Sequence, residues 1–544
     1  MSTYTAKELR GADLYWLMTV TVAGRVFRFA SGACNVDEAR TGATHSYSGR
    51  LVTVDPPRVE IGDGGDTPQG SASVSWVHPS ADGWAALDDA DDLSDATGEL
   101  ALWVSGLDYA SRQIVVAGRL EVTSYGDETE PVEATLYTSI ADDLATVPPV
   151  ELVATEDRWP RAGAVDMIIP EDSVGTTYPM VVGAPGYDAD LTTLKGWPVY
   201  VVELDDSDRS NVTNAAVVLI HAGQAACVGA TVKLYNLETG LSATVSVTRS
   251  TDKAGAVVSI ATVAAGTLSI SEGQALSASA LSLTPVGVVG PSERAGGLYG
   301  AGDVVRWLLM QSTTRIDFGA MDGDLEALNQ YRVDGIFNVG TSPLELVKTD
   351  ILPIFPCGWY VAPDGIALRA WPRSATEADC VARIGPDYGC ERVSGIEPTP
   401  IEEVYHAFRI EYGMDMEEDA PKRSISLVPD ADPLDATQVS SPHCRPPQAR
   451  GGIPPTRYQL RWAETLSAEL VSSYQTAFAL VNAQAERGGH QRRAVDYDCP
   501  QEYQAIQVGS PVWWVRVAGG TGRVCRVMGV TYGLTRCIVT LETL

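Results

Sequence analysis

Hydrophobic and polar side chains alternate in many short runs along the first 150 residues, between turns rich in glycine and aspartate. An alternation with a period of two predicts β-strands that are buried on one face. Leu14–Ala23 and Val26–Ala30 flank Gly24 and Arg25, a spacing that predicts a β-hairpin. Further strands are predicted at Arg50–Val54, Ser71–Val77, Leu100–Val104, Gln113–Thr123 and Val132–Ile140. Many short strands joined by turns are typical of a β-sandwich or β-barrel, which we expect for residues 1–150.

A second region, residues 151–295, follows links at Pro148-Pro149 and Trp159-Pro160. Within it, residues 205–290 are rich in Ala, Val, Thr and Ser, and apolar side chains again recur at nearly every second position. This composition could belong to a disordered linker, but the regular placement of Val, Leu and Ile favours strands. We therefore expect a β-rich inserted module at 205–290.

The period of the pattern changes between residues 296 and 400, where apolar side chains recur every three or four residues. Ala301–Gln311 is predicted to be an amphipathic helix, and Asp324–Arg332 a second, short one. Ser342, followed by proline and by glutamate three residues on, is a strong helix start. Two strands are predicted on either side of a Pro-Asp-Gly turn, at Gly358–Val361 and Ile366–Trp371. This stretch is therefore expected to form an α+β domain.

The last region, residues 401–544, is predicted to be a second α+β domain. Its elements are the strand Glu403–Met414, the helix Ala463–Arg487, the strand Arg493–Asp498 and two closing strands at Arg523–Tyr532 and Cys537–Leu544. The helix is predicted from one apolar stripe at spacings of three and four, formed by Leu466, Leu470, Tyr474, Phe478 and Val481. A stretch rich in Pro and Asp, Pro429–Thr456, is predicted to be a long surface loop. The fold class expected for the whole chain is mainly β, with α+β modules in a multidomain arrangement.

The composition of the chain fits this architecture and disfavours several functions. Its 544 residues are too many for one hydrophobic core, and about 3–5 domains are expected. The formal net charge of −31 argues against nucleic-acid binding, because that binding needs cationic side chains against the phosphates. The nine cysteines are scattered without a CxxC pair, which is typical of free thiols in a reducing cytoplasm. No signal peptide or membrane-spanning segment is expected, since the most apolar stretch, Ala215–Ala230, is too short.

Motifs of the common enzyme classes are absent from the sequence. It contains no GxSxG nucleophile turn, no HExxH zinc motif and no Gly-Lys pair of a nucleotide-binding loop. His443 and Cys444 could contribute to a metal site, but adjacent side chains seldom chelate one ion. An iron–sulfur cluster is conceivable from Cys357, Cys380, Cys390 and Cys444, although the spacing of these cysteines matches no standard pattern. We therefore assign no catalytic, cofactor-binding or metal-binding residue, and we expect a protein that is not an enzyme and uses no cofactor.

Two acidic clusters and two aromatic pairs have simpler interpretations. The acids gather at Asp88–Asp95 and at Asp415–Asp419, and neither cluster has the spacing of a calcium loop, so both are expected to be solvated loops. The paired acids of a glycoside hydrolase need only converge in space, so spacing does not exclude them. Trp513 and Trp514 point to opposite faces of a strand, so one is expected in the core and the other at a domain or subunit interface. The pair Tyr15-Trp16 has the same interpretation.

Short sequence phrases follow one another in a definite order along the chain. In the C-terminal region they are IEYGMD (Ile410–Asp415), RYQLR (Arg457–Arg461), the long helix, RAVDYD (Arg493–Asp498) and VGSPVWWV (Val508–Val515). Earlier ones are LYWLMTVTVAGRVFRFASG (Leu14–Gly32), YSGRL (Tyr47–Leu51), TYPMVVGAPG (Thr177–Gly186), VVRWLLMQSTT (Val304–Thr314) and SPLELVKTDILP (Ser342–Pro353). Together they resemble the baseplate or tail-tip hub proteins of tailed bacteriophages, a family also found in gene-transfer particles. The resemblance covers most of the chain, but not residues 205–290.

This resemblance implies a virion structural protein, the homotrimeric hub at the tip of a long non-contractile tail. Two domains of each subunit would resemble the tail-tube fold, so three subunits would offer a pseudo-six-fold ring to the six-fold tube and join it to a three-fold spike or fibre. The implied partners are distal tail and tail-tube proteins, a central fibre or spike protein and the tape measure protein. The protein would be made in the host bacterial cytoplasm and reside at the tail tip. DNA would pass through the channel without specific binding, and part of the acidic excess is expected to line that channel.

Two other functions stay open at this point. One is a tail-associated cell-wall hydrolase or glycosidase carried on a hub scaffold, against which the missing motifs weigh. The other is a carbohydrate-binding adhesion protein, with residues 205–290 as its binding module. A zymogram on peptidoglycan and a glycan-binding assay distinguish these functions from the structural one.

Overall fold

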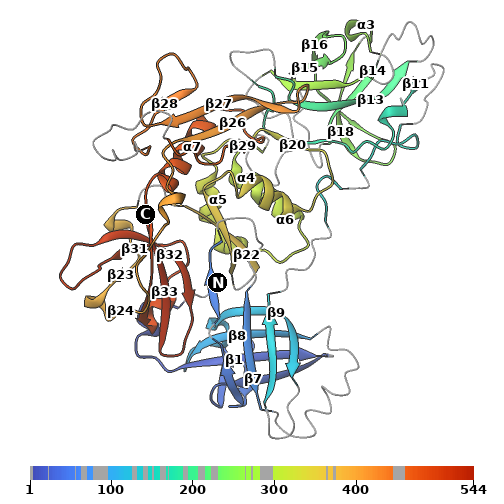
Figure 1. Ribbon diagram of the computed structural model, residues 1–544. Helices are drawn as coiled ribbons and strands as arrows, with labels where there is room; N and C mark the ends of the chain where they lie inside the picture. Colours follow the sequence, from blue (N-terminus) through green and yellow to red (C-terminus); the bar gives the residue numbers. More distant parts are fainter. Residues whose placement is uncertain are drawn as a thin grey trace.

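The fold is known from a computed structural model of the chain (Figure 1). It describes residues 4–22, 24–55, 57–62, 70–77, 96–124, 131–138, 145–149, 152–159, 167–169, 171–187, 194–205, 215–221, 231–263, 265–270, 274–281, 298–362, 365–371, 375–444 and 460–544. Several predicted features lie outside these residues: the acids of Asp88–Asp95, the Pro363-Asp364 turn, residues 445–456 of the predicted loop and the first three residues of RYQLR. The mainly β, multidomain fold class is confirmed by the four larger sheets of the described residues.

The N-terminal domain is built on a seven-stranded antiparallel sheet of order β2-β1-β8-β9-β10-β7-β5. Its elements are α1 (Ala6–Leu9), β1 (Leu14–Val22), β2 (Arg25–Ala30), β3 (Cys34–Glu38), β4 (Ala43–Tyr47), β5 (Leu51–Val54), β6 (Arg58–Glu60), β7 (Ser71–Trp76), β8 (Thr97–Val104), η1 (Tyr109–Ser111), β9 (Gln113–Ser124) and β10 (Val132–Tyr137). The strands predicted from alternation are all present, because their inward side chains, such as Met18, Leu100 and Leu136, form one closed core. The hairpin β3–β4 was not predicted, since its strands carry too many charged and polar residues.

Residues 167–280 contain a second large sheet, of order β16-β15-β19-β13-β14-β18-β17 with β11 beside β13. Its elements are β11 (Met167–Ile168), η2 (Glu171–Ser173), β13 (Trp197–Asp205), β14 (Ala215–His221), β15 (Thr231–Asn236), β16 (Ser242–Ser246), β17 (Thr248–Thr251), β18 (Val257–Val263), α3 (Ala265–Leu268) and β19 (Leu276–Ala280). The strands β16 and β17 lie at opposite ends of the sheet order, yet only the buried Val247 separates them in the chain, so the sheet curls around its core. The predicted strand content of 205–290 is confirmed in the described part, and the sheet also includes β13, which precedes that stretch.

The central α+β part places helices against a small hairpin. Its elements are β12 (Met180–Val182), α4 (Ala301–Gln311), α5 (Phe318–Leu328), β20 (Gly335–Phe337), α6 (Pro343–Leu346), the π-helical η3 (Val347–Ile351), β21 (Cys357–Ala362) and β22 (Gly365–Ala370). Helix α4 and the cap at Ser342, whose Oγ accepts from the Glu345 amide at 3.1 Å, agree with prediction. The second helix, predicted at Asp324–Arg332, begins earlier, as α5 at Phe318. Asp317 caps its start by accepting from the Ala320 amide at 3.0 Å.

The C-terminal part contains two sheets and the helix α7. The four-stranded sheet has the order β28-β27-β26-β29, and the larger one has the order β23-β31-β32-β33-β30-β24, with β25 beside β30 and β6 beside β32. The elements are η4 (Glu377–Asp379), β23 (Arg383–Ile384), η5 (Pro386–Tyr388), β24 (Glu391–Arg392), β25 (Glu397–Pro398), η6 (Ile401–Glu403), β26 (Phe408–Asp415), β27 (Ala420–Val428), β28 (Gln438–Ser440), β29 (Leu466–Ala468), α7 (Tyr474–Gly488), β30 (Arg493–Pro500), η8 (Gln501–Ala505), β31 (Pro511–Trp514), β32 (Arg523–Thr531) and β33 (Arg536–Thr543). None of the described helices has the length and hydropathy needed to cross a membrane.

The long helix predicted at Ala463–Arg487 is wrong in its first half. Leu466 belongs to β29, which pairs in parallel with β26, and the helix begins only after Ser473, whose side chain caps it. Its buried face is formed by Thr476, Ala477, Leu480, Val481 and Ala485, while Tyr474 is 49% exposed. The apolar spacing of Leu466, Leu470 and Tyr474 therefore came from a strand, a loop and an exposed ring that happened to be in helical register.

The N-terminal and C-terminal β-domains lie side by side and are locked together (Figure 1). The short strand β6 leaves the N-terminal domain and pairs with β32, and the Ile61 amide donates to the Met528 carbonyl at 2.9 Å. Gln501 on η8 donates from its side chain to the carbonyls of Leu9 and Ala12. Main-chain hydrogen bonds of β6 and side-chain hydrogen bonds of Gln501 both cross this boundary, so the two β-domains are directly joined.

Candidate assembly surfaces

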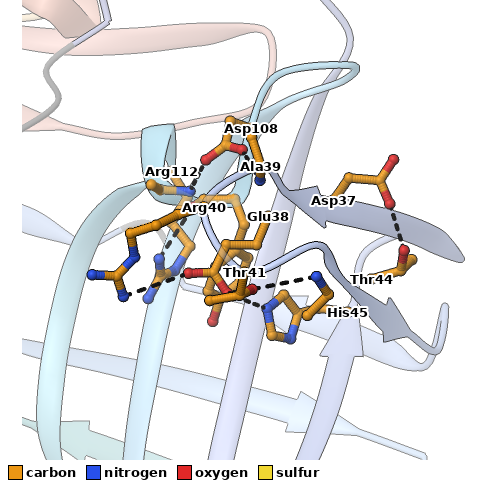
Figure 2. Close-up of polar contacts among 12 residues, drawn as sticks. Asp37, Glu38, Ala39, Arg40, Thr41, Thr44, His45, Asp108 and Arg112 are labelled. Carbon is orange, nitrogen blue, oxygen red and sulfur yellow. Dashed lines mark hydrogen bonds and ion pairs between the residues drawn. The ribbon is translucent and has the colours of Figure 1, made fainter.

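The β3–β4 hairpin carries a dense network of polar contacts on the N-terminal domain (Figure 2). Strand pairing sets Asp37 opposite Thr44, whose hydroxyl donates to the Asp37 carboxylate at 2.7 Å. Glu38 accepts from Thr41 at 2.7 Å and lies 3.3 Å from Nε2 of His45. These contacts, the Thr41 bond first, lower the pKa of Glu38. The hairpin is therefore fixed from within by an ionised acid near its tip.

The same hairpin is anchored to the loop that contains η1. The Asp108 carboxylate accepts from the backbone amides of Ala39, at 2.6 Å, and Ala110, at 2.8 Å, and these bonds lower its pKa (Figure 2). The His45 ring packs against Tyr109 with centroids 4.1 Å apart and planes tilted by 33°, and the Arg112 guanidinium covers the Tyr109 ring at 3.8 Å. A hairpin held at its tip and along one face is a preorganised contact surface, because little conformational entropy is lost when it binds.

The apolar side of the hairpin has its own small core. Val36 and Tyr47 pack with Leu17, Ala30 and Trp103, all nearly or fully buried. At the tip, by contrast, the Arg40 side chain is 87% exposed. The hairpin thus presents a charged, exposed tip on a buried base, an arrangement suited to contact with a neighbouring subunit.

The two aromatic pairs alternate between the two faces of their strands as predicted. Trp514 is buried and donates from Nε1 to the Tyr497 hydroxyl at 3.0 Å, while Trp513 is half-buried against Gly522. Trp16 is buried, and Tyr15 lies 5.9 Å from Trp103, centroid to centroid. The core half of each prediction is confirmed, and the interface role of the outward ring stays a prediction.

The cysteines considered for an iron–sulfur cluster are not gathered. Among the described residues no group of three or more His, Cys, Asp or Glu side chains could hold a metal ion. Instead Cys390 lies beside Cys499, which pairs across the sheet with Cys537. The hydrogen bond with Cys499 lowers the pKa of Cys390 to about 7, whereas this contact and burial raise the pKa of Cys499. The chain therefore places Cys390, just before β24, beside Cys499 on β30, which in turn pairs with Cys537 on β33. These positions are too far apart in sequence for spacing to predict.

The acidic cluster Asp415–Asp419 is solvated as expected at Glu417, Glu418 and Asp419, which are exposed, but not at Asp415. Asp415 is buried and accepts from the backbone amides of Lys195 and Glu417. Glu417 pairs with the Lys195 ammonium group, and Glu418 pairs with Lys422 at 2.7 Å. The cluster therefore joins the four-stranded sheet to the segment before β13. The sequence around the cluster does not predict this contact, because its partner Lys195 lies 220 residues away.

Among solved structures, this chain aligns with several phage tail proteins. No protein-family model and no curated protein matches the chain. A tail protein from Neisseria meningitidis aligns over 97% of this chain and 96% of its own, with 10% identity and a TM-score of 0.36. A 43 kDa tail protein of prophage MuSo2 from Shewanella oneidensis aligns over 97% and 98%, with 7% identity and a TM-score of 0.35. A prophage tail protein from Listeria monocytogenes aligns over 67% and 94%, with 10% identity and a TM-score of 0.27. Scores of this size do not establish a shared fold.

Proposed function

We propose that this chain is a virion structural protein, the homotrimeric hub of a bacteriophage tail tip. The observation that carries the proposal is the joined pair of β-domains, in which β6 of the N-terminal domain is a strand of the C-terminal sheet. Three copies of such a pair offer six β-domains in one ring. A ring of this kind matches a six-fold tail tube at one end while keeping three-fold symmetry for a spike or fibre at the other.

The proposed assembly needs head-to-tail contacts, in which two different surfaces of each copy meet. The anchored β3–β4 hairpin is one such surface, and partly exposed aromatic rings such as Tyr474 and Trp462 are others. The proposed neighbours are distal tail and tail-tube proteins, a central fibre or spike protein and the tape measure protein. In this proposal the chain resides at the tail tip of a long non-contractile tail.

DNA crosses the proposed channel without being held. The chain carries 70 acidic and 39 basic side chains, and its net charge of −31 disfavours contact with phosphates. We propose that part of this acidic excess lines the channel. An electrostatic map of the assembled ring with a basic channel wall would contradict this part of the proposal.

Native mass spectrometry of the purified chain tests the proposal most simply. We expect a species of three times the 57.9 kDa chain mass, and particle images with three-fold symmetry and a central opening. A chain that stays monomeric at all concentrations, and is also absent from the ring in assembled tails, would contradict it. A peptidoglycan zymogram that shows clearing would favour the cell-wall hydrolase instead, and glycan binding that requires residues 205–290 would favour the adhesion protein.

A further inference from the structure

A cavity of about 640 Å³ opens between α7, the segment after η3 and the C-terminal sheet. Its volume is in the range of binding pockets, which is about 300–1,000 Å³. The apolar part of its wall is formed by Leu352, Ile354, Phe355, Leu466, Leu480 and Val524. A cavity of this size and lining can hold an apolar side chain together with part of the backbone that carries it.

The polar part of the wall is cationic, although the protein is strongly acidic. Arg526 and Arg487 lie against the Trp371 ring, with guanidinium carbons 3.7 Å and 5.2 Å from its centroid. Arg526 and Arg492 share the two carboxylate oxygens of Glu542, at 2.7 Å and 2.6 Å.

The described wall of the cavity carries more arginines than acidic side chains. Arg487, Arg492, Arg523 and Arg526 line it, together with Glu486 and Glu542. The wall therefore favours an occupant that is apolar at its tip and anionic around it.

One polar group of the wall lacks a partner. The Oε1 atom of Gln484 is buried and accepts no hydrogen bond within the part of the chain that the structure describes. A buried acceptor without a donor costs free energy. An occupant that brings a backbone N–H group to this point would remove that cost.

The loop between β27 and β28 has the complementary chemistry. Leu434 at its tip is 94% exposed, the largest exposure among the large hydrophobic side chains of the described residues. Asp430, Asp432 and Asp435 surround it in the sequence. An apolar side chain that is exposed to water and flanked by acids is the converse of an apolar cavity rimmed by arginines.

The loop is also held in one conformation. The Leu434 amide donates to the Asp432 carboxylate, the Asp432 amide donates to the Gln438 side chain, and the Thr437 amide donates to the Asp435 carboxylate, each at 3.0 Å. Ala431 donates to the Ser440 hydroxyl, also at 3.0 Å. Because the loop is ordered before contact, little entropy is lost when Leu434 is buried.

We propose that Leu434 of one copy inserts into the arginine-rimmed cavity of the next copy, with the aspartates of its loop facing the arginines. Leu434 and the cavity lie on different surfaces of the same chain, so the contact is head-to-tail and can repeat around a ring. The inference rests on the proposed trimer and names the contact that builds it.

Cross-linking between two single variants of the full chain tests this contact. One carries Leu434→Cys, the other Ala483→Cys in the cavity wall, and the mixture is oxidised with diamide. We expect a disulfide-linked pair that contains one of each variant. The control replaces Leu434→Cys by Val339→Cys, which is 69% exposed on a different element and should give no such pair.

A second measurement uses association strength. Leu434→Asp places a charge at an exposed position and leaves the fold intact, and we expect it to weaken self-association at least about tenfold. The control Val339→Asp should leave association unchanged. If the wild-type chain forms trimers while no mixed disulfide appears and Leu434→Asp associates normally, the contact is wrong and the trimer stands. If the mixed disulfide forms in open filaments and not in trimers, the contact stands and the closed hub is wrong.

Discussion

Single polar side chains join segments of this protein that are far apart in the sequence. The Asp334 carboxylate accepts from the Ala184 amide at 2.7 Å, from the Ser472 hydroxyl at 2.7 Å and from Nε of Arg332 at 2.8 Å. The Asp252 carboxylate pairs with Arg158 at 2.7 Å in the same manner. Because a buried charge is stable only when it is paired and hydrogen-bonded, each of these acids fixes the relative position of several loops.

His406 makes stability depend on pH. Its Nδ1 accepts from the Arg461 amide at 3.1 Å, and burial, followed by the charge of Arg461, lowers its pKa. Below the ordinary histidine pKa of about 6.5 the unfolded chain therefore binds more protons than the folded one, so stability falls as the pH falls. We expect His406→Gln, which stays neutral, to lose less free energy of unfolding than wild type between pH 7.5 and pH 5. Equal losses in urea unfolding of both proteins would contradict this.

The Trp514–Tyr497 hydrogen bond is predicted to matter for stability. Tyr497→Phe leaves the buried Nε1 donor of Trp514 without its acceptor, which should lower the free energy of unfolding by about 1–3 kcal/mol. Tyr503→Phe is the matched control, because its hydroxyl donates to the Arg383 carbonyl at the surface, and its loss should be below about 1 kcal/mol. Urea unfolding that ranks the two variants in the opposite order would refute this account.

At the scale of elements, the strands were predictable and their long-range partners were not. In β1 every second side chain from Met18 to Val22 is buried, and such an alternation is a local property of the sequence. Strand β6 has only three residues, and its partner β32 lies more than 460 residues further on, so no local pattern reveals it. The group formed by Cys390, Cys499 and Cys537 was missed for the same reason, since register and not spacing creates it. The helix α7 was predicted to start too early because Leu466 and Leu470, which precede it, matched its period.

The β6–β32 pairing is predicted to hold the two β-domains together. Ile61→Pro removes the amide that donates to Met528, so β6 should detach and the Tyr532 amide, which donates to Pro57 at 3.1 Å, should exchange its hydrogen faster. Ile61→Val keeps the amide and should leave this exchange nearly unchanged. Hydrogen-exchange mass spectrometry distinguishes the two variants. Unchanged protection in Ile61→Pro would show that contacts other than the β6–β32 pairing hold the two domains together.

The β3–β4 hairpin is predicted to depend on its anchor. Asp108→Ala removes the acceptor of the Ala39 and Ala110 amides, which should loosen the hairpin and speed hydrogen exchange at its tip. Asp37→Ala removes only the contact with Thr44 and should leave the tip protected. Exchange that is equally slow in both variants would mean that the packed His45 and Tyr109 rings suffice.

At the scale of the whole molecule, the proposed function depends on surfaces. The described residues contain no metal-binding group, and the polar side chains singled out above are engaged in structural contacts. What remains exposed is an anchored hairpin, an acidic loop with Leu434 at its tip and a cavity rimmed by arginines. The resemblance of the sequence phrases indicated a class of assembly, but the surfaces that would build it came only from the folded chain.

Cryo-electron microscopy of tail particles that contain this chain tests the central claim most directly. We predict three copies around the axis at the tail tip, with the N-terminal and C-terminal β-domains alternating in one ring of six against the tail tube. A map in which the chain is absent from the tip, or forms a ring of any other copy number, would contradict the account.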